Sequence, residues 1–163
     1  MQSFRVIKPT AALVPYVRHY WVLSDDALAP VSERTLPVGC VQMVFHRGRQ
    51  LFSLTEGRLQ PSSFISGQAF GYSDVESTGM LEMIVVVFQP FAAKAFLHMP
   101  VSEFRGMNVN TEETGDPLLV DLGRRIADMP DRVACIRLIE EFLLSRLYAF
   151  PEYNLKRVST VLE

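Results

Sequence analysis

The β-rich part of the sequence ends in Leu81-Glu82-Met83-Ile84-Val85-Val86-Val87-Phe88-Gln89-Pro90. Its run of branched and aromatic residues predicts a buried strand over 81–88. Gln89-Pro90 ends that strand, because proline cannot donate a hydrogen bond to a sheet. Upstream, glycine-punctuated segments predict further strands at 19–23, 33–36, 40–46, 50–54, 64–68 and 74–77. Strands at this spacing favour a barrel or a sandwich.

After Pro90 the pattern changes from strands to helices. A helix is expected over 91–99, before Pro100. Asp116-Pro117 marks a clear helix start, since aspartate caps the first turn and proline suits the first helical position. The expected apolar stripe of this helix, 116–129, consists of Leu118, Leu122, Ile126 and Met129. A second helix is expected over 131–148, capped by Asp131, and a last segment beginning near Asn154 has no stop signal before the chain ends.

Composition narrows the class of protein. The formal net charge is only −2, which argues against a nucleic-acid-binding surface on this chain. The start of the chain lacks the features of a signal peptide, and the longest apolar run, 83–88, is too short to span a bilayer. The two cysteines, Cys40 and Cys135, form no C-x-x-C pair. We therefore expect a cytoplasmic protein with reduced thiols and no membrane association.

No catalytic or metal-binding motif is visible. The histidines His19, His46 and His98 form no H-x-H pair on a strand, so we expect no metal and no cofactor. Ser66-Gly67 lacks the preceding glycine of a nucleophile elbow. We therefore expect a protein that is not an enzyme.

Arg34 is the most notable charge, because it lies within a predicted strand. An arginine on an inner barrel face could bind an anionic ligand through two hydrogen bonds. The alternatives are an ion pair with a structural carboxylate such as Glu82, or a position facing solvent. Trp21, the only tryptophan, has two interpretations as well: stacking on a ligand or packing in the core.

Four short motifs occur in an order that resembles one group of AraC/XylS-type transcription regulators. They are Pro15-Tyr16-Val17-Arg18-His19-Tyr20-Trp21, Arg34-Thr35-Leu36-Pro37-Val38-Gly39-Cys40-Val41-Gln42-Met43-Val44-Phe45-His46, Ser66-Gly67-Gln68, and Val87-Phe88-Gln89-Pro90-Phe91-Ala92-Ala93 followed by Met99-Pro100. Together they extend over almost the whole chain. Val38 departs from the pattern, because the family usually has an acidic or small residue there.

The resemblance implies an α+β architecture with two parts. An N-terminal cupin-like β-barrel or sandwich over 1–115 would sense a small-molecule effector, and a helical linker and dimerisation segment over 116–163 would follow. A helix-turn-helix domain, absent from this chain, would make the DNA contacts. Strand alternation and analogy with sugar-sensing relatives of the fold predict a ligand site made of Trp21, Arg34, Met43, Phe45, Gln68 and Glu82.

A homodimer is expected to form through the helix over 131–148. Its apolar arc is wider than one contact needs, so the same residues could pack within one chain or against a second chain. The predicted dimerisation residues are Ile136, Ile139, Phe142, Leu143 and Leu147. Two other functions stay open: a metal-free β-barrel enzyme acting on a small molecule, and a dimerisation module without any ligand.

Overall fold

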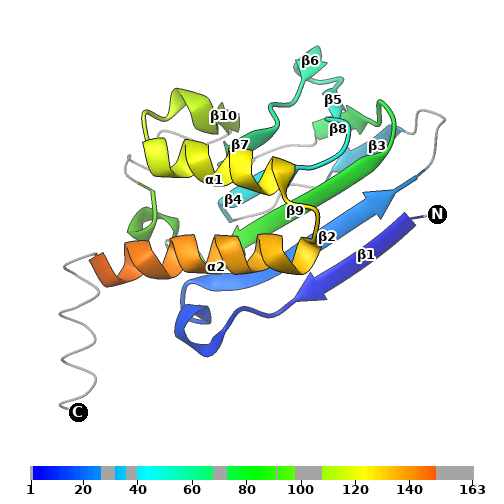
Figure 1. Cartoon of the computed structure of the whole chain (residues 1–163). Helices are drawn as coiled ribbons and strands as arrows, with labels where there is room; N and C mark the ends of the chain where they lie inside the picture. Colours follow the sequence, from blue (N-terminus) through cyan, green and yellow to red (C-terminus); the bar gives the residue numbers. More distant parts are fainter. Residues whose placement is uncertain are drawn as a thin grey trace, which may run out of the picture.

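The computed structural model describes residues 2–26, 32–35, 40–67, 73–90, 92–97 and 108–149, without the side chains of 2, 32–35, 73, 148 and 149. These residues form an α+β fold in which two antiparallel sheets carry a pair of C-terminal helices (Figure 1). The class predicted from the sequence is therefore confirmed.

The larger sheet contains six strands in the order β1-β2-β9-β4-β7-β10. β9, the strand expected over 81–88, pairs on one side with β2 and on the other with β4. Its position in the interior of the sheet explains its nearly continuous apolar sequence. The strands are β1 (Gln2–Ile7), β2 (Val17–Asp25), β9 (Leu81–Phe88), β4 (Gln42–His46), β7 (Ser63–Ser66) and β10 (Asn108–Asn110).

The smaller sheet has four short strands in the order β3-β8-β5-β6. The strands are β3 (Ser32–Thr35), β8 (Ser73–Glu76), β5 (Phe52–Ser53) and β6 (Arg58–Leu59). Within the described residues no strand pairing joins the two sheets, so they form a sandwich and not a closed barrel. The barrel half of the sequence prediction is wrong, because alternation shows that strands bury one face and does not show whether a sheet closes on itself.

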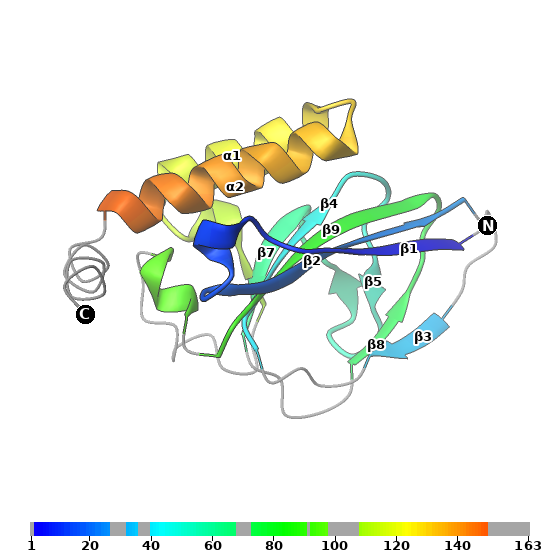
Figure 2. The same cartoon turned by 90° about the horizontal axis from the view of Figure 1, so that it is seen from below.

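Two helices cover the larger sheet on the side opposite the smaller one (Figure 2). α1 (Pro117–Asp128) begins as expected, with the Asp116 carboxylate accepting a hydrogen bond from the Leu119 amide. α2 (Arg132–Ala149) follows after a short turn, where the Val133 amide donates to the Asp131 side chain. The result is three layers: helices, large sheet and small sheet.

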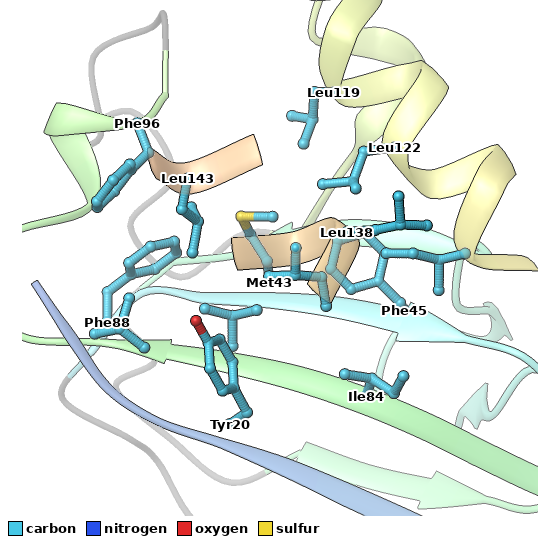
Figure 3. Packing of buried hydrophobic residues seen from close by; sticks show 14 of the residues in the cluster. Tyr20, Met43, Phe45, Ile84, Phe88, Phe96, Leu119, Leu122, Leu138 and Leu143 are labelled. Carbon is cyan, nitrogen blue, oxygen red and sulfur yellow. The ribbon is translucent and has the colours of Figure 1, made fainter. Parts of the chain in front are cut away.

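The large sheet therefore separates two apolar cores. On its helix side, alternate residues of β2, β4 and β9 pack against α1 and α2, as Figure 3 shows for Tyr20, Met43, Phe45, Ile84 and Phe88. The intervening residues, among them Val44, Val85 and Val87, form the core between the two sheets together with Phe64 of β7 and Val75 of β8. In β4 the side chains alternate as in any strand, since Met43 and Phe45 lie on the helix side and Val44 lies on the other.

Local predictions failed at three places. Leu119 and not Leu118 belongs to the buried stripe of α1, and Leu118 is 62% exposed. The described part of the helix expected over 91–99 forms only a 3-10 turn, η2 (Ala93–Ala95). β1 was not predicted, because at the edge of the sheet Phe4 and Val6 remain exposed and the segment lacks the pattern of a buried strand.

Candidate ligand-binding site

A cleft of about 610 Å³ lies where one end of the large sheet meets the turn between α1 and α2. Four segments line it: the end of β2 with Asp25 and Asp26, the turn after β4, the start of β9 and the first residue of α2, Arg132. The lining is strongly charged, since it includes Arg47, Arg49, Arg132, Asp25, Asp26 and Glu82.

The turn Arg47-Gly48-Arg49 brings two arginines to this cleft. The Arg47 amide donates to the Glu82 carbonyl over 2.7 Å, and the Arg49 amide donates to the Met80 carbonyl over 2.7 Å. These bonds hold the turn against the start of β9. A Cβ atom at Gly48 would lie 2.5 Å from the Met80 carbonyl oxygen, so the close approach of the two segments requires glycine.

Glu82 joins two arginines from different layers. Its Oε1 atom accepts from Arg47 Nη1 over 2.8 Å and from Arg132 Nε over 2.6 Å. Arg47 Nη2 also donates to the Met129 carbonyl, at the C-terminal cap of α1. The sheet is therefore connected to both helices at their shared turn through one carboxylate and two guanidinium groups.

Burial makes this network sensitive to the loss of any member. The Arg47 side chain is only 7% exposed, against 25% for Glu82 and 48% for Arg132. Removing one partner of a buried ion pair leaves an uncompensated charge in a medium of low polarity. Within the described residues Arg47 Nε is buried without a hydrogen-bond partner, so even the intact network leaves one donor of this guanidinium unused.

Of the four predicted ligand-binding residues whose side chains the structure describes, only Glu82 lines the cleft. Met43 and Phe45, each 1% exposed, belong to the core beneath the helices. Trp21 is half-buried against the core between the sheets, with its ring 5.7 Å from that of Phe4. These three residues fill apolar layers and do not border the cleft.

Arg34 and Gln68 are the other two residues of the predicted ligand-binding site. Arg34 lies in β3 and pairs in register with Asp74, but its side chain lies outside the described residues. Gln68 lies outside them entirely.

The sequence analysis did not identify Arg47 and Arg132 as site residues. The only local signal is the pair of arginines around Gly48, in the short segment between the strands predicted at 40–46 and 50–54.

The predicted dimerisation residues are largely covered within one chain. Ile139, Leu143 and Leu147 are fully buried in the helix-side core, and Ile136 and Phe142 pack partly against it. Figure 3 shows Leu143 directed toward the sheet, near Phe88 and Met43. The wide apolar arc of α2 is therefore explained mainly by packing on the sheet, and of the five predicted residues the partly buried Ile136 and Phe142 are the ones a second chain could still contact.

His46 and the two cysteines are titratable groups that lie buried outside the cleft. Burial lowers the pKa of His46, whose Nε2 lies 3.0 Å from Gln60 Oε1. Cys40 and Cys135 are buried free thiols on opposite sides of the large sheet, and burial raises the pKa of Cys135.

Among the described residues no three His, Cys, Asp or Glu side chains are grouped to hold a metal ion. None of the helices in the described ranges combines the length and the apolar character needed to cross a bilayer.

Comparison with known proteins identifies a family without an assigned activity. No curated protein matches the chain significantly. The crystal structure of CoII HppE in complex with Tris buffer is similar at 10% sequence identity and a TM-score of 0.40, over 53% of this chain and 53% of that chain. So low a similarity supports no conclusion about activity, and the aligned region spans only about half of that chain. Nothing in the comparisons supports membership of the AraC/XylS family, whereas a family model matches residues 5–110. The chain therefore belongs to the family of the domain of unknown function DUF6597.

Proposed function

We propose that this chain is the effector-sensing and dimerisation domain of an AraC-type transcription regulator. The observation that carries the proposal is the Arg47–Glu82–Arg132 network, which lines the cleft and connects the sheet to the turn between α1 and α2. A ligand bound in the cleft would contact this network, which connects the sheet to the helices. The motifs shared with AraC/XylS-type regulators add the expectation of a DNA-binding domain in the same protein.

The mechanism would be a shift between two arrangements of the helix turn. In one arrangement, that of the structure, Arg132 Nε at the first residue of α2 donates to Glu82 Oε1 over 2.6 Å. A ligand that binds these arginines more strongly in another arrangement would shift the population toward it. The size of the response is limited by the difference in ligand affinity between the two arrangements.

A second candidate function is a dimerisation module that binds no small molecule. The observation that favours it is the burial of Met43 and Phe45 against the helices, since these residues were predicted to line an internal pocket. The two functions differ in whether the cleft matters for regulation, because a module without a ligand would tolerate changes there that leave the fold intact.

The test uses the whole gene product. Chromatin immunoprecipitation is expected to recover specific promoter fragments, and Glu82→Gln is expected to change expression from those promoters severalfold. Glu112→Gln is the matched control, since Glu112 pairs with Arg124 on the exposed surface of α1 over 3.3 Å, away from the cleft. Thermal unfolding of both variants separates loss of signalling from loss of fold.

Each outcome decides one part of the proposal. Failure to recover specific DNA contradicts the transcription-regulator function. Specific DNA with equal expression in both variants contradicts the sensing role and supports the module without a ligand. Residues 1–163 alone, with a net charge of −2, are expected not to bind duplex DNA at physiological salt, which a fluorescence anisotropy titration checks.

A further inference from the structure

We propose that the cleft binds a small organic monocarboxylate. This inference rests on the proposed function, because it specifies the effector class for the same cleft. The argument comes from the unused hydrogen-bond donors, the balance of charge and the apolar part of the lining.

The arginines of the cleft hold more donors than the acidic groups occupy. Arg132 uses only Nε in its bond to Glu82, and no partner of its two terminal nitrogens is found in the described part of the chain. Arg49 makes no side-chain hydrogen bond to any described residue. Arg47, with 7% of its side chain exposed, keeps a buried Nε without a partner there. A carboxylate, like a phosphate, accepts two parallel bonds from a guanidinium.

The charges of the lining limit the ligand to one negative group. The lining contains three arginines and three acidic residues, so the formal charges of these side chains cancel. Because the lining has no surplus of positive charge, it does not favour a second negative group on the ligand. A single carboxylate near Arg49 and Arg132 meets the donors that no described residue uses.

An apolar side chain at the rim fits an organic body. Met80, which also lines the cleft, is 61% exposed, and its neighbour Leu81 is buried. Methionine adapts its flexible thioether to apolar ligands of different shape. Contact with Met80 would therefore favour a hydrocarbon-bearing carboxylate over inorganic phosphate of similar charge.

The experiment compares carboxylates with amides of the same shape on the purified chain. The probes are isobutyrate against isobutyramide and benzoate against benzamide, at constant ionic strength set with chloride, because salt screens exposed charges. Calorimetric titration is expected to give dissociation constants of about 1 mM for the carboxylates and no binding for the amides. Inorganic phosphate is expected to bind more weakly than either carboxylate.

Three variants locate the binding. Arg49→Gln removes donors that no described residue uses, so the fold is preserved, and the carboxylate affinity is expected to fall by about tenfold. Arg132→Gln is expected to have a similar effect. Arg124→Gln is the control, because Arg124, like Arg132, is a helical arginine that pairs with one glutamate, but it does not line the cleft. The carboxylate affinity of this variant should equal that of the native chain.

The proposal is overturned if neither carboxylate binds better than its amide, if the Arg49 and Arg132 variants bind as the native chain does, or if phosphate binds more tightly than both carboxylates. Titration of the isolated chain does not depend on DNA. Carboxylate binding without promoter recovery would therefore leave the ligand class intact and refute only the regulatory function.

Discussion

Arg146 Nη2 lies 2.6 Å from Asp116 Oδ1, and the two side chains are only 5% and 7% exposed. The pair joins the last turns of α2 to the residue that caps α1. Arg146 also lies 4.8 Å from the centre of the Phe142 ring and donates to the Phe96 carbonyl over 3.4 Å. One buried guanidinium therefore fixes both helices and the segment after β9 at the end of the molecule opposite the α1–α2 turn.

Asp116→Asn is expected to lower the free energy of unfolding by about 3 kcal/mol, because it removes the negative charge that lies 2.6 Å from the buried Arg146 guanidinium. Asparagine caps a helix about as well as aspartate, so the loss reports the charge and not the cap. Urea unfolding followed by circular dichroism measures it. Asp121→Asn, on the exposed side of α1, should change the value by less than about 0.5 kcal/mol.

A double-mutant cycle with Arg146→Met checks the cause. The apolar replacement should recover part of the stability lost in Asp116→Asn, since no unpaired charge then remains buried. Additive losses in the double variant would show that the two side chains do not interact.

Tyr20 is expected to stay protonated in the folded chain above pH 10. Burial, with the Glu140 carboxylate 3.1 Å from its hydroxyl, raises the pKa of Tyr20. A raised folded-state pKa gives stability that is present below the ordinary pKa of about 10 and is lost as the pH rises further. Native chain and Tyr20→Phe should therefore develop the same tyrosinate absorbance until the chain unfolds. A smaller absorbance in the variant would show that Tyr20 ionises in the native state.

His46 is expected to make the fold sensitive to acid. Burial lowers the pKa of His46 from 6.5, although its bond to Gln60 opposes the shift. The contribution to stability is present above 6.5 and decreases as the pH falls below it, because the unfolded chain then takes up a proton that the folded chain does not. This single site contributes at most about 1.4 kcal/mol per pH unit.

Urea unfolding at pH 7.5 and 5.5 measures that effect. His46→Gln should lose less stability between the two conditions than the native chain does. Equal losses would contradict the assignment and would mean that His46 titrates alike in the folded and unfolded states.

Leu143→Asp is expected to unfold the chain, because Leu143 is fully buried within one copy. A buried carboxylate without a partner costs more than about 3 kcal/mol. Val133→Asp on the same helix should stay folded, since Val133 is 60% exposed. Circular dichroism measures the fold and light scattering the mass. A folded Leu143→Asp chain of half the native mass would place Leu143 in a dimer interface, and a native chain of monomer mass would refute the dimer prediction.

The sequence by itself determined the elements whose signals are local. Asp116-Pro117 located the start of α1, because a cap and a first-turn proline act within a few residues. Alternation assigned Met43 and Phe45 to one face of β4, and the long apolar run 81–88 identified the strand that β2 and β4 flank. Local signals were insufficient for α1, where Leu118 and Leu119 are equally apolar neighbours and the direction of the sheet decides which of them is buried.

Only the tertiary structure decided whether the sheets close, which faces the helices cover and where the cleft lies. Glu82 meets Arg47 and Arg132 across sequence separations of 35 and 50 residues, and no spacing rule links such positions. In the sequence Met43 and Phe45 could equally have lined a pocket, and Leu143 could have faced a second chain. Packing against other segments decided their roles, because an apolar side chain carries no information about which apolar surface will cover it.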